Sequence, residues 1–150
     1  MLQSLPVGEP AIVRLAYPHM MKLDALVWTQ FLKDDRYDID QVWYDVKVGA
    51  PIGVPDNSDA ALLAIAEGTG CKRIDAVAQV GPELWIIEIK PYANYVPLGQ
   101  VLTYVDLFRE KYATSLTLRP VIVCAGSDPD LTRMFTEHKV KIIQVSKEPW

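Results

Sequence analysis

A predicted β-hairpin limits the possible folds of this chain more than any other feature of the sequence. Two runs rich in β-forming residues, 73–80 and 84–90, are joined by the turn sequence Gly-Pro-Glu at 81–83. Runs of this kind on either side of a compact turn are typical of two antiparallel strands. Opposed residues of a hairpin have numbers with a constant sum, so a turn centred between the Gly and the Pro places Asp75 opposite, or nearly opposite, Glu88. The sequence therefore predicts two carboxylates side by side on one face of the hairpin.

These two carboxylates lie in an apolar setting, and a lysine accompanies them. Lys90, two residues beyond Glu88, points to the same face because side chains alternate along a strand. Two carboxylates that face each other in a core sheet raise the pKa of at least one of them and destabilise the fold unless a cation lies between them. Mg²⁺ fits that position, since one or two carboxylates commonly hold it together with water and phosphate. Asp75 and Glu88 are the predicted metal ligands, and the backbone carbonyl of Ile89 is a further candidate ligand.

The remaining pattern of the 150 residues predicts a mixed α/β sandwich with a central sheet flanked by helices. We expect one domain over residues 1–150, because no stretch resembles an independent second unit. A loop is expected between Pro91 and Pro97, and Asn57 or Ser58 is a candidate cap for a short helix. The expected helices cover 19–33, 59–67, 98–111 and 131–138, and the strands outside the hairpin cover 42–48, 121–125 and 140–145.

Composition restricts the cellular setting and the partners. No apolar run approaches the roughly 20 residues that cross a bilayer, and the N-terminal residues lack the features of an export signal, so we expect a cytoplasmic protein without membrane association. Cys71 and Cys124 have no metal-ligand spacing, and we expect reduced thiols with Cys124 buried. The net charge of −4 disfavours attraction of nucleic acid to the whole surface. Any phosphate contact therefore needs a local basic patch, for which Lys47, Lys72 and Arg73 are the candidates.

Two spaced motifs in this sequence resemble those of a known enzyme family. Asp75 is followed after twelve residues by Glu88-Ile89-Lys90, and Gln100 and Tyr104 lie four residues apart on the next predicted helix. The first pattern resembles the PD-(D/E)XK nuclease superfamily, and the second is similar to the QxxxY motif of its RecB-type branch. Ile74 stands where the family name has Pro. The resemblance implies a restriction-endonuclease-like αβββαβ core.

The resemblance also implies a role for each matching residue. Asp75 and Glu88 would bind Mg²⁺, with Mn²⁺ as a substitute, and Lys90 would orient or help deprotonate the attacking water or stabilise charge that develops on phosphorus. Gln100 and Tyr104 would position the nucleic acid backbone or the residues of the site. Many family members supply a further acidic residue from the first helix, for which Asp24 is a candidate; a second candidate lies near the insertion between the first two strands, Glu67.

The expected function is metal-dependent hydrolysis of phosphodiester bonds in DNA, without an organic cofactor. One alternative is an exposed hairpin face with a simple cross-strand salt bridge. Another is a catalytically silent nucleic-acid-binding or assembly module on the same fold, and a third is a toxin or restriction-type nuclease that works with a recognition subunit. The sequence leaves open endo- or exonucleolytic cleavage, the form of the substrate, and whether RNA is accepted. A homodimer is a reasonable expectation for a small acidic chain that grips a duplex.

The histidines and tryptophans are expected outside the chemistry. His19 and His138 have no metal-ligand spacing and are predicted to be structural or exposed. Trp28, Trp43 and Trp85 are predicted to lie in the core or at its edge, and Trp150 is a terminal residue.

Overall fold

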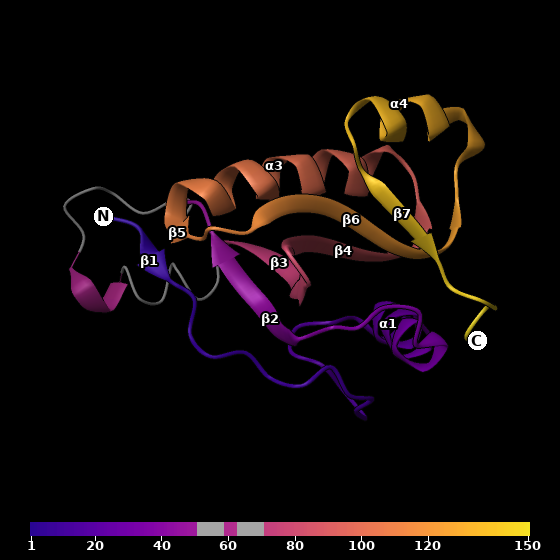
Figure 1. The fold of residues 1–150 in the computed structure, drawn as a ribbon, viewed down its shortest axis with the longest axis horizontal. Coiled ribbons are helices and arrows are strands. Elements are labelled where there is room, and N and C mark those ends of the chain that lie inside the picture. The colour runs from indigo at the N-terminus through magenta and orange to yellow at the C-terminus, as the bar shows by residue number, and fades with distance from the viewer. Residues whose placement is uncertain (51–58, 63–70) are drawn as a thin grey trace.

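A five-stranded mixed sheet forms the middle layer of the computed structural model, which describes residues 1–50, 59–62 and 71–150. The strand order is β2-β3-β4-β6-β7, with antiparallel pairing from β2 to β4 and parallel pairing from β4 to β7. Helix α1 (Lys22–Asp34) lies on one face and α3 (Tyr95–Lys111) on the other (Figure 1). This confirms the predicted α/β class with a central sheet between helices. The strands are β2 (Gln41–Val48), β3 (Lys72–Val80), β4 (Glu83–Ala93), β6 (Thr117–Ser127) and β7 (Lys141–Gln144).

The β3–β4 hairpin has the predicted register. Val80 pairs with Glu83 and Ala76 pairs with Ile87, so the two-residue turn is centred where the sequence placed it. Gly81 in this turn has a φ of 57°, a left-handed conformation that favours glycine. The same register places Asp75 across from Glu88, immediately beyond the last paired residues.

Strand β4 is longer than predicted, because it continues through Pro91 to Ala93. The predicted loop between the two prolines is therefore wrong. Pairing of β4 with β3 ends at Ile87, whereas pairing with β6 continues to Ala93. A proline without an N–H is tolerated in β4 because, among the described residues, the strand pairs at that level with β6 alone.

The starts of both long helices differ from the predicted ones. Helix α1 begins at Lys22, three residues later than predicted, because His19 has a φ of 57° and cannot be part of a right-handed helix. Helix α3 begins at Tyr95, three residues earlier than predicted, and the Asn94 side chain caps it by accepting a backbone N–H of the first turn. Pro97 lies in that first turn, where its missing N–H leaves no helical hydrogen bond unmade.

The smaller elements agree in part with expectation. The predicted helix over 131–138 is present as η1 (Pro129–Leu131) followed by α4 (Thr132–Glu137). A two-stranded parallel sheet of β1 (Gln3–Ser4) and β5 (Tyr112–Ala113) was not predicted, since strands of two residues have no periodicity to read. Residues 60–62 are helical, and the rest of the predicted helix 59–67, with its candidate caps Asn57 and Ser58, lies outside the described residues apart from Asp59.

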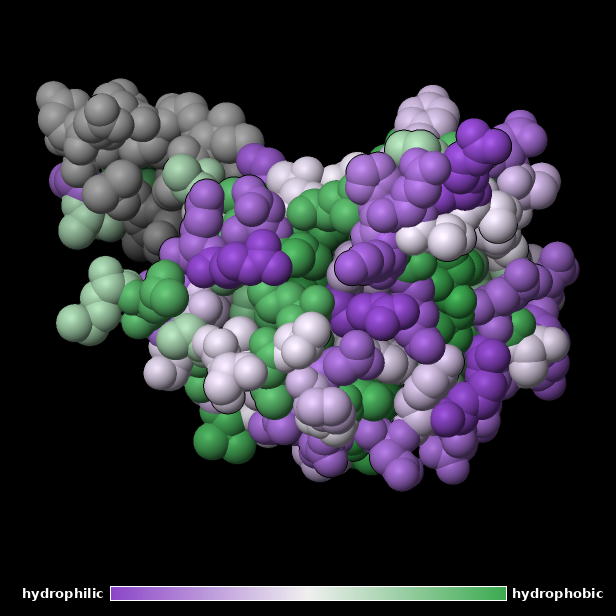
Figure 2. Space-filling view, turned by 45° about the horizontal axis from the view of Figure 1, so that its top comes forward, coloured by the Kyte–Doolittle hydropathy of each residue, from purple (hydrophilic) through white to green (hydrophobic). Residues whose placement is uncertain are grey.

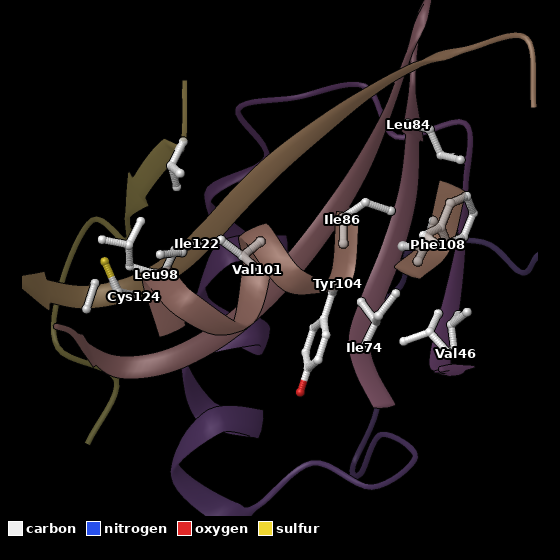
Figure 3. Close-up of a cluster of buried hydrophobic side chains, with 14 of the residues drawn as sticks. Val46, Ile74, Leu84, Ile86, Leu98, Val101, Tyr104, Phe108, Ile122 and Cys124 are labelled. Carbon is white, nitrogen blue, oxygen red and sulfur yellow. The ribbon is translucent and has the colours of Figure 1, made fainter. Parts of the chain in front are cut away.

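The sheet separates two hydrophobic clusters, one under each helix. The α3-side cluster includes Phe108 and Ile74 (Figure 3), and the α1-side cluster includes Trp28 and Trp85. Trp28 and Trp85 are buried and Trp43 is partly buried, which confirms the predictions for these three residues, and Trp150 is exposed. The face that carries α3 presents both hydrophilic and apolar side chains (Figure 2).

Two further sequence predictions concern the thiols and the membrane. Cys124 is buried and Cys71 is partly buried, and both are free. Within residues 1–50, 59–62 and 71–150, no helix has the length and apolar character needed to cross a bilayer.

Candidate active site

Asp75 lies where the ladder between β3 and β4 ends, and its side chain takes over the next hydrogen bond. The backbone N–H of Ile89 donates to Asp75 Oδ2 over 2.9 Å. The side chain therefore accepts a hydrogen bond from an N–H of β4 that lies beyond the last regular pair, Ala76 with Ile87. This contact fixes one oxygen of the carboxylate beside β4, on the strand that also carries Glu88 and Lys90.

The ladder between β2 and β3 is interrupted at the same level. Tyr44 pairs with Ala76 and Val46 pairs with Ile74, but the position between them is unpaired and Asp45 has a φ of 53°. Tyr44 and Ala76 belong to the α1-side cluster, whereas Val46 and Ile74 belong to the α3-side cluster. Side chains two residues apart normally share a face, so both strands reverse their facing here. Asp75 thus occupies a position where neither neighbouring ladder constrains it.

Glu88 and Asp75 form a closely coupled pair of carboxyl groups. Glu88 is 2% exposed, and burial raises its pKa strongly, with a further increase from the charge of Asp75. Burial also raises the pKa of Asp75. The hydrogen bond from the Ile89 N–H and the charge of Lys90 partly offset this increase. Each of the two carboxyl groups shifts the pKa of the other, so the pair favours a state in which one of them carries a proton. Without a bound cation, that proton relieves the repulsion between the two groups.

Helix α1 brings a third carboxylate toward this pair. Asp24 in the first turn of α1 is 7% exposed, and burial raises its pKa while the charge of Lys90 lowers it. Its charge in turn raises the pKa of Asp75. Lys90 thus interacts electrostatically with three acidic groups, and Asp24 is the helix-one acid that lies near the pair. The other sequence candidate, Glu67, lies outside the described residues.

Helix α3 contributes the two residues of the QxxxY pattern on the other flank. The pKa of Tyr104 is raised by burial and by the charges of Glu88 and Asp75, and the nearby Gln100 side chain partly offsets this increase. Figure 3 shows the Tyr104 hydroxyl pointing away from the apolar side chains around its ring. Gln100 Oε1 is buried and lacks a hydrogen-bond partner among the described residues. The helix therefore presents polar atoms to the carboxyl pair.

The donor atoms at this place suit a hard divalent cation. Glu88 Oε1 is buried and, in the part of the chain that the structure describes, has no hydrogen-bond partner. Leaving a buried acceptor unsatisfied costs about 1–3 kcal/mol, and more for a charged group, which a cation ligated by that oxygen would relieve. No group of three or more His, Cys, Asp or Glu side chains within residues 1–50, 59–62 and 71–150 could hold a metal ion unaided. Two carboxylates completed by water and phosphate remain a common arrangement for Mg²⁺, and the Ile89 carbonyl stays a predicted ligand.

The three predicted phosphate contacts do not form a single patch. Lys47 pairs with Arg73 across β2 and β3, so these two side chains share a face, whereas Lys72 is next to Arg73 and extends from the opposite face. Arg73 also has neighbours that the sequence did not predict. Its Nη1 lies 3.2 and 3.3 Å from the carboxylate oxygens of Asp45, and it hydrogen-bonds the Nε2 of His19. His19 is exposed as predicted, but its contact with a residue 54 positions away leaves no signal in the sequence.

Comparison of the chain with models of protein families, with curated proteins and with solved structures gave no match.

Proposed function

We propose that this protein is a divalent-metal-dependent nuclease that hydrolyses phosphodiester bonds in DNA. The observation that carries the proposal is the buried pair Asp75 and Glu88, which has an unsatisfied oxygen on Glu88, lies beside Lys90 and is too buried to hold two charges without a proton or a cation. A binding module has no use for two carboxylates next to a phosphate, because they repel it. The pair is useful when a cation replaces the proton.

The order of elements supports a restriction-endonuclease-like core. Helix α1, the strands β2, β3 and β4, helix α3 and strand β6 follow one another as αβββαβ, and the acidic pair lies on the second and third of these strands. This is the arrangement that the resemblance to PD-(D/E)XK nucleases implies for Asp75 and the Glu88-Ile89-Lys90 run. We therefore propose both the restriction-endonuclease-like fold and the nuclease activity.

The position of each residue suggests its role in the proposed reaction. Asp75 and Glu88 would hold the metal, and Asp24 would add negative charge from the side of α1. When bound, Mg²⁺ or Mn²⁺ polarises a phosphate oxygen and makes a water molecule more acidic. The Lys90 ammonium group lies among the carboxylates and can orient that water or stabilise the negative charge that develops on phosphorus.

The α3 flank would fix the geometry around this centre. The Gln100 side chain lies close enough to Tyr104 to lower the pKa of its hydroxyl, and the buried Gln100 Oε1 can accept a hydrogen bond from a further group at the site. Both residues project from one helix face, since they are one turn apart. They would position the carboxylate pair or the strand that is cleaved.

The test is cleavage of linear, nicked, branched and single-stranded DNA, and of single-stranded RNA, with Mg²⁺ or Mn²⁺. The wild type is compared with the near-isosteric variants Asp75→Asn, Glu88→Gln and Lys90→Met. Glu83→Gln is the matched control, because Glu83 is a carboxylate on the same strand, at its other end, where it pairs with Arg119 at 3.5 Å. We expect metal-dependent cleavage by the wild type and the control and none by the three site variants. Equal cleavage by all five proteins would indicate a contaminant, and no cleavage by any of them on any substrate would contradict the proposal.

A further inference from the structure

His19, Asp45 and Arg73 form a second polar cluster. Their three segments adjoin the candidate metal site. His19 Nε2 and both Asp45 oxygens contact one guanidinium nitrogen, Arg73 Nη1, and His19 Nε2 is also 3.4 Å from Asp45 Oδ2. The His19 side chain is 61% exposed, whereas those of Arg73 and Asp45 are 21% and 16% exposed. The cluster is therefore open to solvent on the histidine side. We refer to these three residues as the Arg73 cluster.

The three segments that form this cluster also carry the acidic residues of the candidate site. Arg73 precedes Asp75 by two residues on β3, and Asp45 lies on β2 at the level of Asp75, where both strands reverse their facing. His19 lies just before α1, whose first turn carries Asp24. The cluster and the carboxyl pair thus depend on the same backbone arrangement.

Two of its members are held in an uncommon backbone conformation. His19 and Asp45 have φ values of 57° and 53°, in the left-handed region that residues other than glycine rarely adopt. Such conformations persist where the surrounding structure holds them, and they gather at binding and catalytic sites. Here two separate segments both adopt this conformation beside one guanidinium group.

The chemistry of the cluster suits a phosphate group. A guanidinium has only donors, so His19 Nε2 accepts from Arg73 in the tautomer that carries the ring proton on Nδ1. The exposed ring can direct that N–H toward an oxyanion that arrives from solvent. Both Asp45 oxygens contact one nitrogen of Arg73, and this grip lacks the two-nitrogen fork of the strongest arginine–carboxylate pairs.

We propose that Arg73 and His19 form a phosphate-binding subsite for the nucleic acid strand, and that Asp45 occupies Arg73 until a backbone phosphate replaces it. The proposal rests on the proposed nuclease function and adds a binding step to it. An internal carboxylate that competes with phosphate weakens binding of every polyanion that fails to make further contacts. In a chain with a net charge of −4, Arg73 would thereby bind mainly a strand that also reaches the metal site.

The test measures binding of fluorescein-labelled single-stranded and duplex DNA by anisotropy in EDTA, where cleavage is absent. Asp45→Asn removes the competing charge and keeps a residue that tolerates a positive φ, so it should bind roughly two- to fivefold more tightly. Arg73→Met should bind about tenfold more weakly, and the slope of log affinity against log salt between about 50 and 200 mM should fall in magnitude by about one. His19→Asn, which also tolerates the backbone, should weaken binding severalfold.

The matched controls are Glu83→Gln and Arg119→Met, since these residues form a comparable ion pair at the other end of the sheet. We expect the affinity of both controls to equal that of the wild type. If Arg73→Met fails to fold by circular dichroism, Arg73→Lys replaces it and should keep the salt slope but lose affinity. An Asp45→Asn variant that binds no more tightly than the wild type, or an Arg119→Met variant that weakens as much as Arg73→Met, overturns the proposal.

A separate cleavage assay distinguishes this proposal from the proposed function. If the protein is not a nuclease, no variant cleaves DNA with Mg²⁺ or Mn²⁺, yet Asp45→Asn still binds more tightly. If the subsite is wrong and the nuclease function is right, the wild type cleaves while binding is insensitive to Asp45 and His19. DNA with and without a 5′-phosphate should bind equally, because the subsite takes a backbone phosphate; dependence on the terminal phosphate would also overturn it.

Discussion

Replacement of Glu88 by glutamine should make the metal-free protein more stable and at the same time abolish its response to metal. Glu88 is buried next to Asp75, and burial together with the charge of Asp75 raises its pKa from 4.5 to about 9. The amide of glutamine has nearly the same shape and can donate to Asp75 as the protonated carboxyl group does. The variant therefore keeps the contact without the cost of keeping a proton on a buried acid.

The size of the effect follows from the raised pKa. The folded protein binds a proton that the unfolded chain releases above pH 4.5, so the contribution of Glu88 to stability is greatest below that pH and decreases until about pH 9. The decrease approaches ~1.4 kcal/mol per pH unit for one group. From pH 6 to pH 8 the advantage of Glu88→Gln over the wild type should thus grow by about 2–3 kcal/mol, or about 5–10 °C in Tm for a chain of this size.

The assay is urea and thermal unfolding in EDTA, followed by circular dichroism at pH 6, 7 and 8. The control Glu83→Gln removes a partly exposed carboxylate, and its stability relative to the wild type should not change with pH in this way. Mg²⁺ or Mn²⁺ at 100 times its Kd should stabilise the wild type by about 2.7 kcal/mol and leave Glu88→Gln unchanged. A variant that is no more stable than the wild type at pH 8, or that gains as much from metal, would refute the reasoning.

Three other changes test the site, the core and the hairpin turn. Lys90→Met should lower the single-turnover rate of DNA cleavage by about 100-fold or more, because it removes the ammonium group that orients water or stabilises the transition state; a rate within threefold of the wild type would exclude that role. Phe108→Ala should destabilise the protein by about 3–5 kcal/mol in urea unfolding, since the ring is fully buried in the α3-side cluster and packs on Tyr112 at 4.8 Å between ring centroids. Gly81→Ala should cost only about 1–2 kcal/mol in the same assay, because the added Cβ meets nothing within 4 Å and the φ of 57° is the sole penalty.

The sequence predicts the position of the acidic pair because the hairpin register depends on local features. A glycine with a positive φ and two β-rich runs determine which residues are opposed, and the structure has Val80 paired with Glu83 as expected. The apolar residues of the hairpin likewise predict a buried sheet. Burial and register together account for the unusual environment of Glu88.

Features that depend on tertiary structure could not be predicted in this way. The sequence predicts a loop between Pro91 and Pro97, but Pro91 is tolerated where β4 no longer pairs with β3, and Pro97 is tolerated in the first turn of α3. The contact of His19 with Arg73 joins segments that are far apart in the chain, and the left-handed conformation of Asp45 has no periodic signature. The Arg73 cluster could therefore not be predicted from the sequence, although Arg73 itself is a candidate for phosphate contact.

The pairing of β4 is asymmetric. Among the described residues, regular pairing of this strand beyond Ile87 is with β6, which places Ile122 beside Glu88 and Cys124 beside Lys90. Ile122 and Cys124 are not part of the acidic site, but their pairing with β4 determines the positions of the Glu88 carboxylate and the Lys90 amine in the ligand-free protein. Substitutions that shift β6 by a fraction of an ångström should thus displace Glu88 and Lys90 and lower the rate of the proposed cleavage.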